Sequence, residues 1–269
     1  MTHNRADAPP SRLTLGALLG AAFHMLAAYH LIFIATVAAP FAFDVIGTTL
    51  LELWNASHRP NAIINLASDG VFLALYSVFL VGLNRAALIG PDAVRRPFHF
   101  SFGRREWLTF AYAVALVGAL SLILLLAISV LSMFLGRNFF AEGLGVIGGA
   151  VPASAAFNLV CVLIAVRFVF IFPAIACDAE FGWRRSWADT RGIAGVLAGI
   201  VFASLMSVTI LKFGEAQLER HYVALGPVGP GVVRVVFDIC YYYLEAVGIL
   251  AVAMAYRQRV GLPVEQRSR

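Results

Sequence analysis

The chain has 269 residues, of which 61% are hydrophobic and only 13% charged, and its formal net charge is +5. An ordinary soluble domain carries about 45–50% apolar and about 25% charged residues. This composition excludes a soluble globular protein and predicts an integral membrane protein.

Six apolar stretches are long enough to cross a bilayer. A spanning α-helix needs about 20 mainly apolar residues, because each backbone N–H and C=O must find its partner within the segment. In chain order the predicted spans are Ala21–Phe43, Ala62–Leu83, Trp107–Phe134, Val151–Ala176, Ile193–Lys212 and Val232–Tyr256. The predicted fold is an all-α polytopic bundle of about six transmembrane helices with short loops. It occupies residues 13–256, between polar tails at 1–12 and 257–269.

The first span has the least certain boundaries. Its apolar run begins near Leu13, so an amphipathic entry helix followed by the span is an alternative to a single helix. A cleaved signal peptide is not expected, because the run is about twice the usual core of roughly 7–15 residues.

The basic residues predict the orientation. Fourteen of the twenty lie in the two tails and in the connections 84–106 and 178–191, whereas only five lie on the other side. By the positive-inside rule, both termini and these connections are expected in the cytoplasm. The sequence pI of about 9.4 reflects these basic residues at the membrane surface and gives no reason to expect nucleic acid as a partner.

The last span carries a polar stripe. Arg234, Asp238, Tyr242 and Glu245 are spaced i, i+4, i+8 and i+11, which places them on one helical face. A charge in the bilayer centre costs at least about 2.5–3.5 kcal/mol, so this face is expected to line the bundle interior. Two interpretations stay open. The stripe is a proton, ion or substrate path in which Asp238 and Glu245 titrate, or it is structural, with Arg234 and Asp238 as a pair.

Asp69 and Arg167 are charged residues inside other predicted spans. With the stripe they make up the predicted intramembrane cluster of Asp69, Arg167, Asp238, Tyr242 and Glu245. Arg167 lies eleven residues from the cytoplasmic edge at 178, and Glu245 lies twelve residues from the same edge at 257. At 1.5 Å per residue their depths agree within one turn, so an ion pair is geometrically allowed, and whether it forms stays open.

The 178–191 connection predicts an amphipathic interfacial helix. Trp183 and Trp187 are four residues apart and share one face, with Arg184, Arg185 and Arg191 beside or opposite them. Indole rings settle at the headgroup level, and arginines attract anionic lipid. This helix is expected to lie on the cytoplasmic leaflet.

The sequence contains no motif that indicates catalysis, a cofactor or a metal site. Gly143, Gly145 and Gly148 form a literal GxGxxG, but it lies between two predicted spans without the βαβ unit that nucleotide binding requires. His24 and His30 lie on different helical faces, so no metal site is expected. No catalytic residue or cofactor is assigned, and the chain is not predicted to be an enzyme. A lipid-active enzyme built from loop residues is a third, weaker hypothesis.

A family resemblance is carried by the end of the fourth span and the connection that follows. The matching residues are Arg167, Pro173, Ala174, Ser186, Trp187, Thr190, Arg191 and Gly192, together with the final AMAYRQRVG. They resemble the YciC-like bacterial membrane proteins and the membrane domain attached to some glycerophosphoryl diester phosphodiesterases. The resemblance covers about a quarter of the chain and implies six helices in the bacterial inner membrane. It implies no activity.

Two functions follow as hypotheses. The first is a non-enzymatic inner-membrane component that organises lipid, with anionic lipid as the candidate ligand, or a protein partner or second copy of the chain. The alternative is a small transporter or channel that uses Arg167, Asp69, Asp238 and Glu245.

Overall fold

The computed structural model describes residues 13–58, 61–94, 102–135, 162–222 and 228–261. Within these ranges the chain is helical and contains no strand, which confirms the predicted all-α class. The helices are α1 (Leu15–Ala28), α2 (His30–Ser57), α3 (Ala62–Leu88), the 3₁₀ helix η1 (Pro91–Val94), α4 (Arg104–Leu135), α7 (Ile171–Ala176), α8 (Trp183–Asp189), α9 (Ala194–Tyr222) and α10 (Val228–Arg259).

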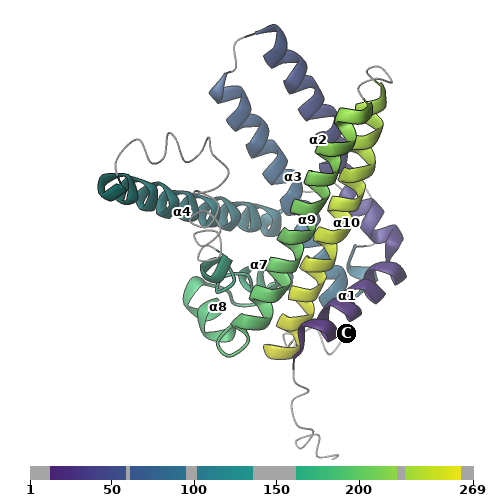
Figure 1. The fold of residues 1–269 in the computed structure, drawn as a ribbon. Helices are drawn as coiled ribbons and strands as arrows, with labels where there is room; N and C mark the ends of the chain where they lie inside the picture. Colours follow the sequence, from purple (N-terminus) through teal and green to yellow (C-terminus); the bar gives the residue numbers. More distant parts are fainter. Residues whose placement is uncertain (1–12, 59–60, 95–101, 136–161, 223–227, 262–269) are drawn as a thin grey trace, which may run out of the picture.

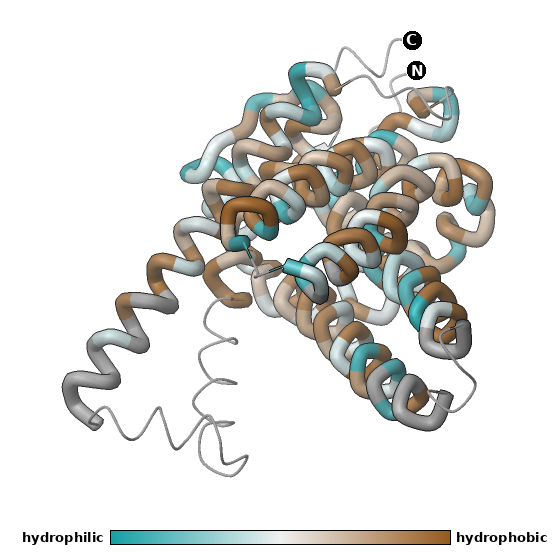
Figure 2. Tube along the Cα trace, turned by 90° about the horizontal axis from the view of Figure 1, so that it is seen from above, coloured by the Kyte–Doolittle hydropathy of each residue, from teal (hydrophilic) through white to brown (hydrophobic). Residues whose placement is uncertain are grey.

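Five of the described helices are long and apolar enough to cross a membrane, so the chain is a multi-pass membrane protein. The apolar segments are His30–Asn55, Ala62–Leu88, Arg104–Ile123, Ala194–Glu215 and Gly231–Arg259. Hydrophobic residues run along most of the length of these helices (Figure 2). Many are exposed, with Leu31, Ile63 and Ile210 at 69%, 77% and 70%, as expected for side chains that face lipid.

Helix α10 forms the centre of the bundle. Half of its most apolar stretch is buried, against 6% for α4. It lies beside α9 along most of its length, with α1 across its C-terminal part and α2 near its N-terminal half (Figure 1). Helix α3 meets the middle of α10, where Phe79 contacts Tyr242. Gly248 lets α9 and α10 approach closely, because a side chain there would clash with the Ser204 hydroxyl. Small residues serve this purpose at helix contacts in membranes.

The first predicted span, Ala21–Phe43, is wrong in its boundaries. The helix breaks at Tyr29, and the spanning helix α2 begins at His30. The shorter α1 precedes it, as in the entry-helix alternative. Helix α1 buries Leu18, Ala22 and Leu26, which recur every four residues, so one face packs against the bundle.

The fourth predicted span, Val151–Ala176, lies largely outside the described residues. Its described end is not one continuous helix, because residues 166–170 form a turn before α7. Pro173 lacks the N–H that would bond to residue 169, which favours a break just before it. The total of six spans therefore stays a prediction.

Candidate functional site

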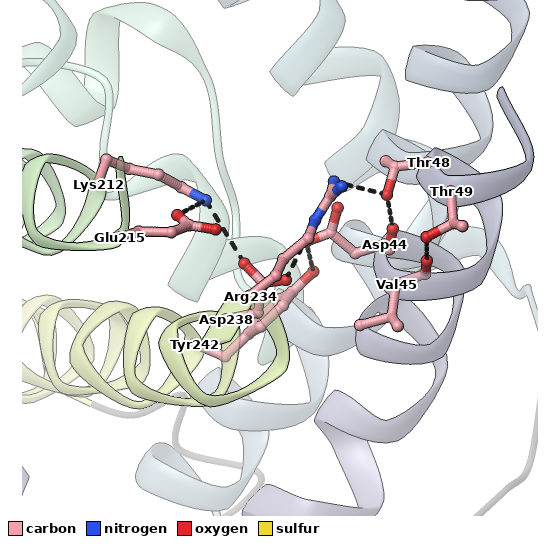
Figure 3. Close-up of polar contacts among 9 residues, drawn as sticks. All are labelled: Asp44, Val45, Thr48, Thr49, Lys212, Glu215, Arg234, Asp238 and Tyr242. Atoms are coloured by element: carbon pink, nitrogen blue, oxygen red, sulfur yellow. Dashed lines mark hydrogen bonds and ion pairs between the residues drawn. The ribbon is translucent and has the colours of Figure 1, made fainter. Parts of the chain in front are cut away.

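A group of charged and hydroxyl side chains joins α2, α9 and α10 (Figure 3). This polar cluster consists of Asp44 and Thr48 from α2, Lys212 and Glu215 from α9, and Arg234, Asp238 and Tyr242 from α10. Asp238 and Glu215 are buried, at 4% and 7% exposed. Charges in membrane helices are costly unless they are paired, so such a group is by default a candidate functional site.

Asp238 is the centre of the polar cluster. Its Oδ1 lies 3.5 Å from Lys212 Nζ, and its Oδ2 lies 3.9 Å from Arg234 Nε. Lys212 also donates to Glu215 Oε2 at 2.8 Å. Each cation therefore has a carboxylate beside it, and the predicted Arg234–Asp238 pair is confirmed. The burial of Asp238 strengthens these ion pairs, because little water screens them.

The α2 side of the polar cluster is held by hydroxyl groups. Arg234 Nη2 donates to Thr48 Oγ1 at 2.9 Å, and the Thr48 hydroxyl donates in turn to the backbone oxygen of Asp44. Tyr242 is fully buried, and its hydroxyl donates to Asp44 Oδ2 at 3.4 Å. Asp44 is thus the one carboxylate of the polar cluster with no cation within ion-pair distance among the described residues.

The structure does not bring the five predicted intramembrane residues together. Asp238 and Tyr242 belong to the polar cluster, but Asp69 is exposed on α3 and forms no ion pair with a described residue. The open Arg167–Glu245 pair does not form. The guanidinium of Arg167 lies 5.1 Å from the ring centroid of Trp187, and Glu245 Oε1 accepts a hydrogen bond from Tyr76 at 2.6 Å. The turn at 166–170 takes Arg167 out of a regular helix, so helical depth no longer predicts its partner.

Arg167 instead anchors the short helix α8. Its backbone oxygen accepts hydrogen bonds from the buried hydroxyls of Ser186 at 2.8 Å and Thr190 at 3.5 Å. Because Ser186 and Thr190 face inward, the opposite face of α8 is exposed. A helix is therefore present within the predicted segment 178–191, and its position is fixed by hydrogen bonds to the turn that precedes α7. Its place on the cytoplasmic leaflet stays a prediction.

The exposed side of α8 carries the predicted tryptophans and arginines. Trp183 and Trp187 are 37% and 49% exposed. Arg185 is paired, with Nη1 at 2.5 Å from Glu180 Oε2 and Nε at 3.7 Å from Asp189 Oδ2. The start of α4 contributes further exposed side chains of the same two types. The arginine–tryptophan surface consists of Trp183, Arg184, Trp187 and Arg191, on α8 and just after it, and Arg104 and Trp107 are exposed at the start of α4.

A forked ion pair joins the start of α4 to the end of α7. Arg105 Nε donates to Asp178 Oδ1 at 2.8 Å, and Arg105 Nη2 donates to Asp178 Oδ2. These hydrogen bonds lower the pKa of Asp178 from its usual value. Beside it, burial raises the pKa of the Cys177 thiol to about 12, so this thiol is neutral at physiological pH. Asp178 has a positive φ of 55°, a conformation that aspartate tolerates better than most residues.

Sequence reasoning missed Asp44, Lys212 and Glu215 as members of one cluster. The spacing of Lys212 and Glu215, i and i+3, is a recognisable ion-pair signal. Nothing local in the sequence places them opposite Asp238, which lies more than twenty residues further along the chain.

Comparison with protein-family models, curated proteins and solved structures finds no match. The resemblance to the YciC-like group therefore stays a prediction.

Proposed function

We propose that this chain is a non-enzymatic component of a bacterial inner membrane that binds anionic phospholipid headgroups through its arginine–tryptophan surface. One observation supports this most. Arg184 and Arg191 are exposed beside two exposed tryptophans, and neither forms an ion pair with a described residue. A free guanidinium beside an indole ring suits the phosphate layer of a membrane.

The basic residues support a cytoplasmic location for this surface. Helix α8 and the end of α10 lie together, since Arg259 donates to the backbone oxygens of Asp189 and Arg191. Both lie in regions rich in arginine, and the positive-inside rule assigns such regions to the cytoplasm. Both termini are then cytoplasmic as well.

The test is the retention of lipid by the purified protein. Nanodiscs of phosphatidylcholine with a fraction of phosphatidylglycerol are extracted gently, and retained lipids are counted by native mass spectrometry. Each basic side chain near an anionic surface contributes about 1 kcal/mol, so the double variant Arg184→Gln, Arg191→Gln should lower phosphatidylglycerol affinity roughly 30-fold.

Arg185→Gln is the matched control. It removes one positive charge from α8, as Arg184→Gln alone does, but from a guanidinium already paired with Glu180 and Asp189, so lipid retention should change little. Equal losses in the control and the double variant would contradict the proposal. So would equal retention of both lipids by the wild-type protein. If another protein is retained in place of lipid, the arginine–tryptophan surface binds a protein partner and not lipid.

A second candidate, a small transporter or channel, is favoured by the polar cluster. Asp44 is the carboxylate there that has no cation within ion-pair distance among the described residues, so it is the group most free to exchange a proton or bind a passing cation. In proteoliposomes loaded with a pH-sensitive dye, Asp44→Asn should abolish flux without unfolding the protein. Asp69→Asn, on the exposed face of α3, is the control. Flux that is absent from the wild type, or unchanged in Asp44→Asn, would rule this function out.

A further inference from the structure

A cavity of about 220 Å³ lies between α3, the segment around α7, α9 and α10. Glu245, in its wall, is the middle residue of the apolar segment 231–259, so the cavity lies near mid-membrane. Leu205, which is 46% exposed, also lines it, so the cavity reaches the lipid-facing surface of the bundle. Most of the remaining wall is apolar, with Val169, Ile200, Val201 and Val252 as examples.

Glu245 enters this cavity with one oxygen unpaired. Its Oε1 accepts the hydrogen bond from Tyr76, whereas its Oε2 is buried and has no hydrogen-bond partner among the described residues. Because Tyr76 has only one hydroxyl proton and gives it to Oε1, it cannot also serve Oε2. A buried carboxylate oxygen without a donor is costly, and such an atom in a native structure calls for an explanation.

Asn84 presents a second unpaired acceptor to the same cavity. It is 1% exposed, and its Oδ1 has no partner in the part of the chain that the structure describes. Its Nδ2 donates to the backbone oxygen of Leu80 at 2.8 Å, so exchanging the amide nitrogen and oxygen would place two acceptors against each other. The Ser204 hydroxyl donates its proton to the backbone oxygen of Ile200 at 3.1 Å and is likewise left as an acceptor. The two unpaired atoms of this wall, Glu245 Oε2 and Asn84 Oδ1, are therefore both acceptors, and the Ser204 oxygen beside them is free to accept as well.

We propose that this cavity binds a small organic cation, a primary or secondary amine in its ammonium form, with the ammonium group against Glu245 Oε2. An ammonium supplies several donors and a positive charge, and the apolar walls suit its hydrocarbon part. This site is separate from the arginine–tryptophan surface and goes beyond the proposed function.

Water and metal ions fit the cavity less well. Its volume equals about seven water molecules at roughly 30 Å³ each, but a buried water needs two to four polar partners, and most of the wall offers none. A hard divalent cation such as Ca²⁺ takes about six to eight oxygen ligands, more than the side chains of this wall provide.

The ammonium group could come from a free amine or from the headgroup of an aminophospholipid. Native mass spectrometry of the wild-type protein from nanodiscs with and without phosphatidylethanolamine separates the two sources. Retention of this lipid by the wild type, and its loss in Glu245→Gln, identifies a headgroup. Binding of a free amine without retention of this lipid identifies a soluble ligand.

The central experiment compares n-butylamine with n-butanol on the purified full-length protein in detergent, with the melting temperature as readout. Butylamine should raise the melting temperature saturably, and butanol should not. Glu245→Gln should weaken the apparent affinity for butylamine about tenfold or more, because a charge-assisted hydrogen bond is lost. Asp69→Asn should bind butylamine as the wild type does.

Two results would overturn the proposal: equal stabilisation by butylamine and butanol, or an unchanged response in Glu245→Gln. If Glu245→Gln does not fold, Val201→Phe decides instead, since it fills the cavity without changing a charge. Butylamine should then lose its effect, and a retained effect would place the amine elsewhere.

Discussion

Two groups of polar side chains on α10 differ in how completely they are paired. In the polar cluster, Asp238 lies between the cations Lys212 and Arg234. In the cavity two turns further along, Glu245 and Asn84 each keep an oxygen to which no described residue donates. The first arrangement joins α9 to α10 through their own charges and α2 to α10 through hydroxyl groups. The second is complete only when something else supplies a donor. Pairing within the chain therefore separates a structural role from a binding role better than charge alone does.

The largest expected effect comes from breaking the polar cluster. Asp238→Asn removes the carboxylate that both Lys212 and Arg234 pair with, while Lys212 keeps its pair with Glu215. Breaking a buried ion pair costs about 3–5 kcal/mol, and the 53% exposure of the Lys212 side chain lowers this to about 2–4 kcal/mol of unfolding free energy. Chemical denaturation in detergent micelles measures it.

Asp69→Asn is the matched control, since it makes the same substitution on an exposed face of a neighbouring helix. It should change the unfolding free energy by less than about 0.5 kcal/mol. If Asp238→Asn were equally mild, the polar cluster would not be a structural junction.

A second prediction concerns the hydrogen bond from the Ser186 hydroxyl to the backbone oxygen of Arg167. Ser186→Ala takes away the 2.8 Å hydrogen bond to the backbone oxygen of Arg167, leaving only the longer one from Thr190. The loss should cost about 1–2 kcal/mol, and hydrogen exchange should become faster in α8, because Ser186 fixes this helix to the turn. Ala188→Ser, on the exposed face of α8, controls for the change in side chain. Unchanged exchange in Ser186→Ala would mean that α8 is held by its ring contacts alone.

The contrasting prediction concerns Glu245. Glu245→Gln should change the unfolding free energy by less than about 1 kcal/mol, because the mutated Oε2 has no partner to lose and the amide oxygen can still accept from Tyr76. The same denaturation experiment that tests Asp238→Asn provides the comparison. A loss as large as that of Asp238→Asn would show that Glu245 is a structural residue, and the contrast between the two sites would fail.

The sequence predicts which residues of α10 share a face at each site. It does not predict which residues of the other helices they contact. Spacing along one helix is local, so the stripe with Asp238, Tyr242 and Glu245 can be identified from periodicity. Asp44 and Tyr76 lie more than 160 residues earlier in the chain, and their contacts with α10 depend on how the helices pack. The Arg167–Glu245 pair does not form for another reason, because the turn before Pro173 changes the direction of the Arg167 side chain.

The smallest expected effect comes from the exposed pair of Arg105 and Asp178, whose side chains are 38% and 55% exposed. Asp178→Asn keeps a side chain that tolerates the positive φ and should cost about 0.2–1 kcal/mol at neutral pH. Because the pKa of Asp178 is lowered in the folded state, its contribution is complete above the unfolded value near 3.8 and is lost as the pH falls through the folded value. The difference in melting temperature between the wild type and Asp178→Asn should therefore be constant above about pH 5 and shrink below it.

The same difference should also shrink in about 1 M salt, which screens exposed charges, whereas the cost of Asp238→Asn should persist. A difference that resists both acid and salt would mean that Asp178 acts through its backbone conformation, and the exposed pair could no longer serve as the weak reference for the buried polar cluster.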